Sequence, residues 1–144
     1  MRVLLDTNAL SEILRSSSDP AVIRWFASQA QDQLFVSAVT QAEMELGAGL
    51  LPRGKRQQKL QAALQELFEQ DFAGRVLPFD GRSVPHYAEI VVARRAAGRP
   101  ISQFDAQIAA IALQHGMALA TRNTRDFEGC GLRLIDPWST RGQG

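Results

Sequence analysis

The chain has 144 residues, which is the usual size of a single domain that can bury its own core. Hydrophobic residues make up 45% and charged residues 22% of it, values that exclude a disordered or fibrous chain. The net charge of +1 argues against a uniformly basic nucleic-acid-binding surface, and the single cysteine, Cys130, excludes an internal disulfide and a multi-thiolate metal site.

The chain begins with a short apolar run, Val3–Leu5, without polar alternation, which is typical of a strand buried on both faces of a parallel sheet. Asp6 follows directly, where the carboxyl end of a central strand faces the ligand crevice of an α/β sheet. Its carboxylate is therefore a candidate for chemistry. Alternatively, Asp6, Thr7 or Asn8 serves only as the N-cap of a helix starting near Ala9, since all three residue types are favoured caps.

A second short strand is predicted at residues 34–36, followed by a helix. Thr40–Glu43 has the form of a capping box, which by itself would give Glu43 a purely structural role. The apolar residues that we expect on the buried side of this helix are Met44, Leu46, Leu50 and Leu51.

Strand-like and helix-like stretches alternate along the rest of the chain. Ser102–Asp105 is another box-like sequence, and it opens a very apolar helix that is predicted to end at Gly116. The alternation favours an α/β sandwich with a mostly parallel sheet. We expect one domain over residues 1–138 and a flexible C-terminal tail over 139–144.

Neither a membrane span nor a secretion signal is apparent. No apolar run approaches the roughly 18 residues that cross a bilayer, and the N-terminus lacks the charged-then-apolar layout of a signal peptide. A cytoplasmic protein is therefore expected.

Three acidic residues share a position that ordinary caps do not require. Asp6, Glu43 and Asp105 each follow a strand or short loop and lie at or near the start of a strongly patterned helix. In a parallel sheet these positions can converge at one edge. Gathered carboxylates raise one another's pKa unless a cation neutralises them, so the pattern predicts a divalent metal.

The available donors indicate which metal and which chemistry. Thr121, Asn123 and Asp126 add only oxygen ligands, a set that suits Mg²⁺, with Mn²⁺ as the alternative. Helix N-termini favour a phosphate beside the cation. Such a site suits hydrolysis of a phosphodiester by a metal-activated water.

Four segments, in this order and at these intervals, resemble the PIN-domain ribonucleases. They are LLDTNALSEIL at residues 4–14, TQAE at 40–43, FDAQIAA at 104–110 and ATRNTRDF at 120–127. The similarity is greatest to the VapC-type toxins of bacterial type II toxin-antitoxin modules, including their trafficking-regulator branch, which similarly end in a Pro-Trp such as Pro137-Trp138. The resemblance implies a PIN-like three-layer sandwich with a mostly parallel central sheet flanked by helices.

The resemblance also implies roles for individual residues. Asp6, Glu43 and Asp105 match the family's first three acids, which hold the metal and position the attacking water. The fourth catalytic position falls on Asn123 or on Asp126, and Asn123 would bring a carbonyl but no charge. Residues that match recurrent supporting positions, where they orient the carboxylates, are Thr7, Asn8 and Thr121.

The function implied is that of a magnesium-dependent endoribonuclease toxin, inhibited by a cognate antitoxin protein. The implied assembly is a homodimer that associates further with antitoxin and contacts operator DNA only through it. Candidate RNA-binding residues, chosen for their charge, are Arg53, Lys55, Arg56, Lys59, Arg122 and Arg125. For the cluster at residues 53–59 a solvated helix face is an equal alternative.

Two other functions fit parts of the pattern. A phosphatase with an aspartyl nucleophile would need a second aspartate two residues after Asp6, where this chain has Asn8. A catalytically weak PIN-fold module that docks an antitoxin in a DNA-binding regulatory complex would tolerate Asn123. Retention of the three acids argues against it, and Mg²⁺ binding that depends on Asp6 would distinguish the two.

Overall fold

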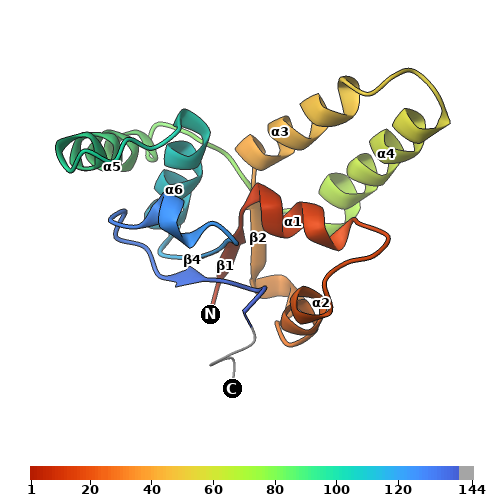
Figure 1. Ribbon diagram of the computed structural model, residues 1–144, viewed down its shortest axis with the longest axis horizontal. Helices are drawn as coiled ribbons and strands as arrows, with labels where there is room; N and C mark the ends of the chain where they lie inside the picture. Colours follow the sequence, from red (N-terminus) through yellow and green to blue (C-terminus); the bar gives the residue numbers. More distant parts are fainter. Residues whose placement is uncertain (140–144) are drawn as a thin grey trace.

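A five-stranded sheet forms the centre of the protein, in a computed structural model that describes residues 1–139 (Figure 1). The strands run in the order β3-β2-β1-β4-β5, and every pairing between them is parallel, which confirms the predicted fold class. Their bounds are β1 (Val3–Leu5), β2 (Leu34–Ser37), β3 (Val76–Leu77), β4 (Ala118–Ala120) and β5 (Leu134–Ile135). Of the predicted flexible tail, residues 140–144 lie outside the described residues.

Six α-helices flank this sheet: α1 (Thr7–Ile13), α2 (Pro20–Ala27), α3 (Ala38–Gly49), α4 (Lys55–Glu66), α5 (Val84–Ala96) and α6 (Gln103–His115). Three short helical segments complete the fold: η1 (Gln31–Gln33), the π-helical η2 (Leu67–Asp71) that continues α4, and η3 (Thr124–Phe127) after β4. No helix in the described part of the chain is both long and apolar enough to span a bilayer.

Both faces of the sheet are covered, so the molecule has three layers. Val3 and Leu5 pack into one apolar cluster with α1, α2 and α4, whereas Leu4 packs into a second cluster with α5 and α6. All three strand residues are fully buried. Burial on both faces explains why this strand reads as a continuous apolar run without alternation.

The pair α3 and α4 forms a helical hairpin that extends away from the sheet (Figure 1). Met44 and Ala48 pack against the core cluster, but Leu46 is 61% and Leu50 75% exposed. The prediction that Leu46 and Leu50 are buried was therefore wrong. Only one face of α3 packs against the rest of the protein. The apolar residues of α3 spread over a wider arc of the helix than this face covers, so some of them stay exposed.

Polar residues mark the carboxyl ends of the three central strands. Asp6 follows β1, Ser37 ends β2, and Thr121 follows β4. The chain moves outward from β1 in one direction to β2 and β3, then in the other to β4 and β5, so β1 and β4 flank a topological switch point. Open parallel sheets bind their ligands in the crevice at this point.

Candidate active site

Asp6 lies at the switch point and is 4% exposed. It is the N-cap of α1, and its Oδ1 accepts a hydrogen bond of 2.8 Å from the backbone N–H of Ala9. Burial raises the pKa of Asp6 to about 6; hydrogen bonds from Thr121 and Ala9 oppose this increase, and the charge of Asp105 adds to it. The cap that we considered as an alternative is thus present, and the same carboxylate faces a second acid.

Glu43 is held by the beginning of α1. Thr7 Oγ1 donates a 2.7 Å hydrogen bond to Glu43 Oε1 and lies 3.1 Å from Thr40 Oγ1. Thr40 in turn accepts a hydrogen bond of 3.3 Å from the Ser37 hydroxyl. The result is a chain of hydroxyl groups that ties the end of β2 to the carboxylate of Glu43.

The predicted capping box at Thr40–Glu43 was wrong. The helix starts one turn earlier, with Ser37 as N-cap accepting from the backbone N–H of Thr40. Because Glu43 therefore lies in the second turn of α3 and accepts from the Thr7 hydroxyl, capping of its own helix does not account for it.

Asp105 lies in the first turn of α6, where the predicted cap is confirmed. Ser102 Oγ accepts a 3.1 Å hydrogen bond from the backbone N–H of Asp105. Burial raises the pKa of Asp105, the Ser102 hydrogen bond lowers it, the charges of Asp126 and Glu43 raise it further, and the charge of Arg94 lowers it. Acids from α3, from α6 and from the segment after β4 therefore act on one another electrostatically.

The segment after β4 carries the other predicted residues. Thr121 is fully buried, and its Oγ1 accepts a 3.0 Å hydrogen bond from the backbone N–H of Asn123. Asn123 and Asp126 are both exposed, but Asp126 lines a cavity of about 210 Å³ together with Asp105. Of the two candidates for the fourth position, Asp126 is the one that shares a cavity with an acid of the site.

Asn8 contributes to the site through its backbone. Its N–H hydrogen-bonds the carboxylate of Asp6, and its side chain is exposed. The structure thus gives Asn8 a contact with the first acid, of a different kind from the side-chain contact made by Thr7.

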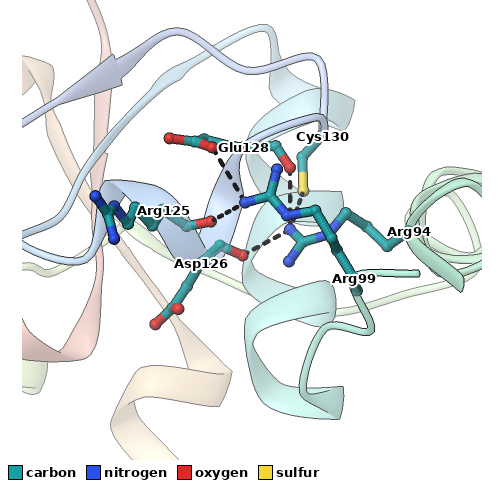
Figure 2. A network of polar contacts seen from close by, with 6 residues as sticks. All are labelled: Arg94, Arg99, Arg125, Asp126, Glu128 and Cys130. Atoms are coloured by element: carbon teal, nitrogen blue, oxygen red, sulfur yellow. Dashed lines mark hydrogen bonds and ion pairs between the residues drawn. The ribbon is translucent and has the colours of Figure 1, made fainter. Parts of the chain in front are cut away.

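Arg94, a residue that sequence reasoning missed, fixes the loop that carries Asp126. It is 6% exposed, and its guanidinium donates to the backbone carbonyls of Asp126 and Glu128 (Figure 2). One signal could have found it: Tyr87, Ile90, Val91 and Arg94 follow the i, i+3, i+4, i+7 spacing of a buried helical stripe. An arginine at a buried stripe position needs acceptors in the interior.

The chemistry of the donors fits a hydrated, hard cation better than a closed metal cage. Within residues 1–139, none of Asp6, Glu43, Asp105 and Asp126 forms a salt bridge. Among the same residues, no three acidic, histidine or cysteine side chains converge closely enough to surround a bare ion. Mg²⁺ is commonly held by one or two carboxylates and several waters, an arrangement that does not require such convergence.

Comparison with known proteins places this arrangement in a family. The family model of the PIN domain matches residues 3–129. The chain belongs to the PIN domain family.

Full-length relatives and a solved structure agree with that assignment. The chain is 44% identical to the plasmid stability protein StbB of Pseudomonas syringae pv. tomato, over 94% of the chain and 98% of StbB. It is 40% identical to the VapC ribonuclease Y4jK of Sinorhizobium fredii, over 94% of the chain and 97% of Y4jK. It is also similar to a chain in the structure of FitAB bound to an IR36 DNA fragment, with a TM-score of 0.89 and 39% identity over 95% and 96% of the two chains.

The candidate RNA-binding residues of this PIN domain fall into two groups. Arg53, Lys55 and Arg56 are exposed at the turn between α3 and α4, at the end of the hairpin away from α6 (Figure 1). Arg122 and Arg125 are exposed in the segment after β4, and the Arg122 guanidinium lies 5.3 Å from the centre of the Trp138 ring. The second group adjoins Asp126 in the chain, whereas the first lies on the hairpin.

Proposed function

We propose that this protein is a metal-dependent endoribonuclease, the toxin of a toxin-antitoxin pair. The observation that carries the proposal is that acids from separate elements of a PIN domain, buried or half-buried, act on one another electrostatically and form no salt bridge within residues 1–139. The 40% identity to a VapC ribonuclease supports RNA as the substrate. Hydrolysis of an RNA phosphodiester is the reaction that this acid set serves best.

Mg²⁺, or Mn²⁺ in its place, is the metal that we propose, with Asp6, Glu43 and Asp105 as its ligands and Asp126 as the fourth acid. When bound, the ion would activate a water and stabilise the charge that develops on the phosphate. The oxygen-only donor set supports a hard cation.

The chain's own residues prepare the site for this reaction. The N–H of Ala9 fixes the Asp6 carboxylate, and the hydroxyl of Thr7 fixes that of Glu43. Asp105, with its raised pKa and partial exposure, is the residue suited to orient a water and accept its proton. Arg122 and Arg125 supply positive charge for the RNA backbone.

The proposed partners are a cognate antitoxin and a second copy of the chain, with operator DNA bound through the antitoxin only. A groove of about 380 Å³ between α1, α3 and α4 supports inhibition by an apolar peptide segment. It is lined by apolar residues such as Leu14, Met44 and Leu64, and Thr7 and Glu43 also line it. A segment lying there would contact the second acid.

Cleavage of a labelled RNA by the purified chain tests the proposal. We expect cleavage with Mg²⁺ or Mn²⁺, none after chelation, and none by Asp6→Asn, which keeps an acceptor for the α1 cap while removing the charge. An Asp6→Asn rate within tenfold of the wild type, or cleavage without divalent ions, would contradict the proposal.

A second candidate is a catalytically weak module whose main role is to dock an antitoxin. The uncharged Asn123 and the similarity to a chain of a DNA-bound FitAB assembly favour it. Titration with Mn²⁺ separates the two, because a docking module has no need for metal binding that Asp6→Asn abolishes. Absence of RNA cleavage together with Mn²⁺ binding that Asp6→Asn leaves unchanged would favour the docking role.

A further inference from the structure

Arg94 carries a buried positive charge beside Asp105, whose pKa it lowers, without forming an ion pair with it. It lies in the last turn of α5 and is 6% exposed. In the described part of the chain its guanidinium forms no salt bridge. Burying a charge outside an ion pair is costly, so the hydrogen bonds that it makes must offset a substantial loss of hydration.

Three of the four hydrogen bonds that Arg94 donates go to one segment, residues 126–130. Arg94 Nη1 donates to the carbonyl of Asp126 at 2.8 Å, to that of Glu128 at 3.0 Å and to Cys130 Sγ at 3.7 Å, while Nε donates to the carbonyl of Arg99 at 2.6 Å (Figure 2). The three Nη1 acceptors lie 32 to 36 residues away along the chain. Arg94 thus joins the end of α5 to the loop that follows β4.

A second arginine reinforces this junction from the surface. Arg99 Nη2 donates to the carbonyl of Arg125 at 3.3 Å and to Glu128 Oε2 at 3.1 Å (Figure 2). Both partners of the Arg99 ion pair are about half exposed, so that pair adds little stability. The buried contacts of Arg94 therefore contribute more to this junction than the Arg99 pair, beside the packing of Phe127 and Cys130 in the core.

The segment that Arg94 binds, residues 126–130, borders the acidic edge. We use this name for the edge of the sheet near Asp6, Glu43, Asp105 and Asp126. Arg94, Asp105 and Asp126 line the same cavity of about 210 Å³, together with Ser102, the cap of α6. The backbone carbonyl of Asp126 is bonded to Arg94, so the position of its α-carbon, and with it the reach of its carboxylate towards Asp105, depends on that bond.

We propose that Arg94 is a positioning residue for the metal site, which holds Asp126 against Asp105 by binding the backbone of residues 126–130. The inference rests on the proposed function only in taking the acidic edge as a cation site. A lysine would not fully replace Arg94, because it donates from one nitrogen and cannot make both the Nε bond to Arg99 and the Nη1 bonds to the loop. Residues that support metal ligands in this way change metal affinity by about 10- to 100-fold.

The test measures Mn²⁺ affinity, by the electron paramagnetic resonance signal of the free ion, together with hydrogen exchange of residues 123–130. Arg94→Gln is compared with Arg95→Gln, an exposed neighbour that undergoes the same chemical change. We expect Arg94→Gln to weaken Mn²⁺ binding by about 10-fold and to speed exchange in this segment, and Arg95→Gln to leave both unchanged.

A second background separates positioning from general damage. Asp126→Asn keeps the carbonyl that Arg94 binds but removes the carboxylate that it positions. We expect Arg94→Gln to change Mn²⁺ affinity by less than about twofold in this background, because its effect acts through Asp126. An equal loss in both backgrounds, or wild-type affinity in Arg94→Gln, would overturn the inference.

Two further outcomes keep the test decisive. If Arg94→Gln does not fold, Arg94→Lys takes its place, and wild-type Mn²⁺ affinity in that variant would overturn the inference. A wild type that binds no Mn²⁺ would overturn it as well. The assay contains no RNA, so it tests Arg94 separately from the nuclease function. If Mn²⁺ binding depends on Arg94 but the wild type cleaves no RNA, the proposed nuclease function is wrong and the role of Arg94 is not affected.

Discussion

The two sides of the acidic edge are built in different ways. On the β1 side, Asp6 and Glu43 are held by the start of α1, through a cap bond and a threonine hydroxyl. On the β4 side, Asp126 lies on an exposed loop whose backbone is bound by Arg94. One side is fixed by the start of a helix, and the other by the buried Phe127 of η3 together with the Arg94 side chain from a helix distant in sequence.

This difference teaches which parts of such a site should tolerate change. Cap bonds and strand ends form wherever their element forms, so they are as stable as the core beneath them. A loop bound by one guanidinium can open locally without unfolding the sheet. We therefore expect substitutions on the β1 side to act on the chemistry and on stability, and those on the β4 side to act mainly on affinity for the metal.

Removing an acid from either side should have the largest effect. We expect Asp6→Asn and Asp105→Asn each to slow RNA cleavage by about 10³-fold or more, the range for loss of a group at the reacting centre. Cleavage rates with Mg²⁺ measure this effect, and circular dichroism checks that each variant is folded. A rate within tenfold of the wild type in either variant would contradict the shared-site interpretation.

Breaking the hydroxyl chain on the β1 side should have the next largest effect. Thr7→Val keeps the shape but removes the donor to Glu43 Oε1, so we expect the Mg²⁺ concentration for half-maximal cleavage to increase by about 10- to 100-fold. Thr7→Ser keeps the hydroxyl and is the matched control, with an unchanged requirement. If valine and serine behave alike, the hydroxyl does not position Glu43.

The buried carboxylate of Asp6 should make the metal-free protein less stable at neutral pH. Its pKa is raised from 3.8 to about 6, so the folded state holds this proton more tightly and gains stability as the pH falls through 6. At pH 7.5 the ionised group costs about 3 kcal/mol, which Asp6→Asn removes. Urea unfolding without divalent ions should find the variant more stable than the wild type at pH 7.5, with a smaller difference at pH 5. The opposite order at pH 7.5 would mean that burial of Asp6 is not destabilising.

Restoring a charge at Asn123 should have the smallest effect. Asn123 is exposed on the β4 side, and we expect Asn123→Asp to preserve or raise the cleavage rate and to leave stability within about 0.5 kcal/mol. Cleavage assays at several Mg²⁺ concentrations measure the change. A large loss would indicate that the amide group, and not charge, is needed at this position.

Sequence reasoning succeeded where one local rule decides the structure. The apolar run of β1, the Ser102 cap of α6 and the left-handed Gly116 that ends α6 with a φ of 64° were all predicted from a few neighbouring residues. The charge of Asp105 raises the pKa of Asp6, and a metal site shared by these two acids stays a prediction.

Sequence reasoning failed where two local signals compete, or where the residue that a side chain contacts is distant in the chain. Ser37 and Thr40 are both good caps, and Ser37 prevails because β2 ends there and its hydroxyl meets the N–H of Thr40. Leu46 and Leu50 have the spacing of a buried stripe, yet no neighbouring element covers them in the described chain. Local pattern cannot tell which apolar face the rest of the fold will cover.

The sequence by itself determined the α/β class, the PIN-domain resemblance and the three acids, since each depends on residue type and spacing along a short stretch. Only the tertiary structure decided that Thr7 holds Glu43 and that Arg94 binds the loop of Asp126, contacts that span 36 and 32 residues. Such contacts depend on where helices pack on the sheet. That packing is fixed by the whole core, not by any one segment.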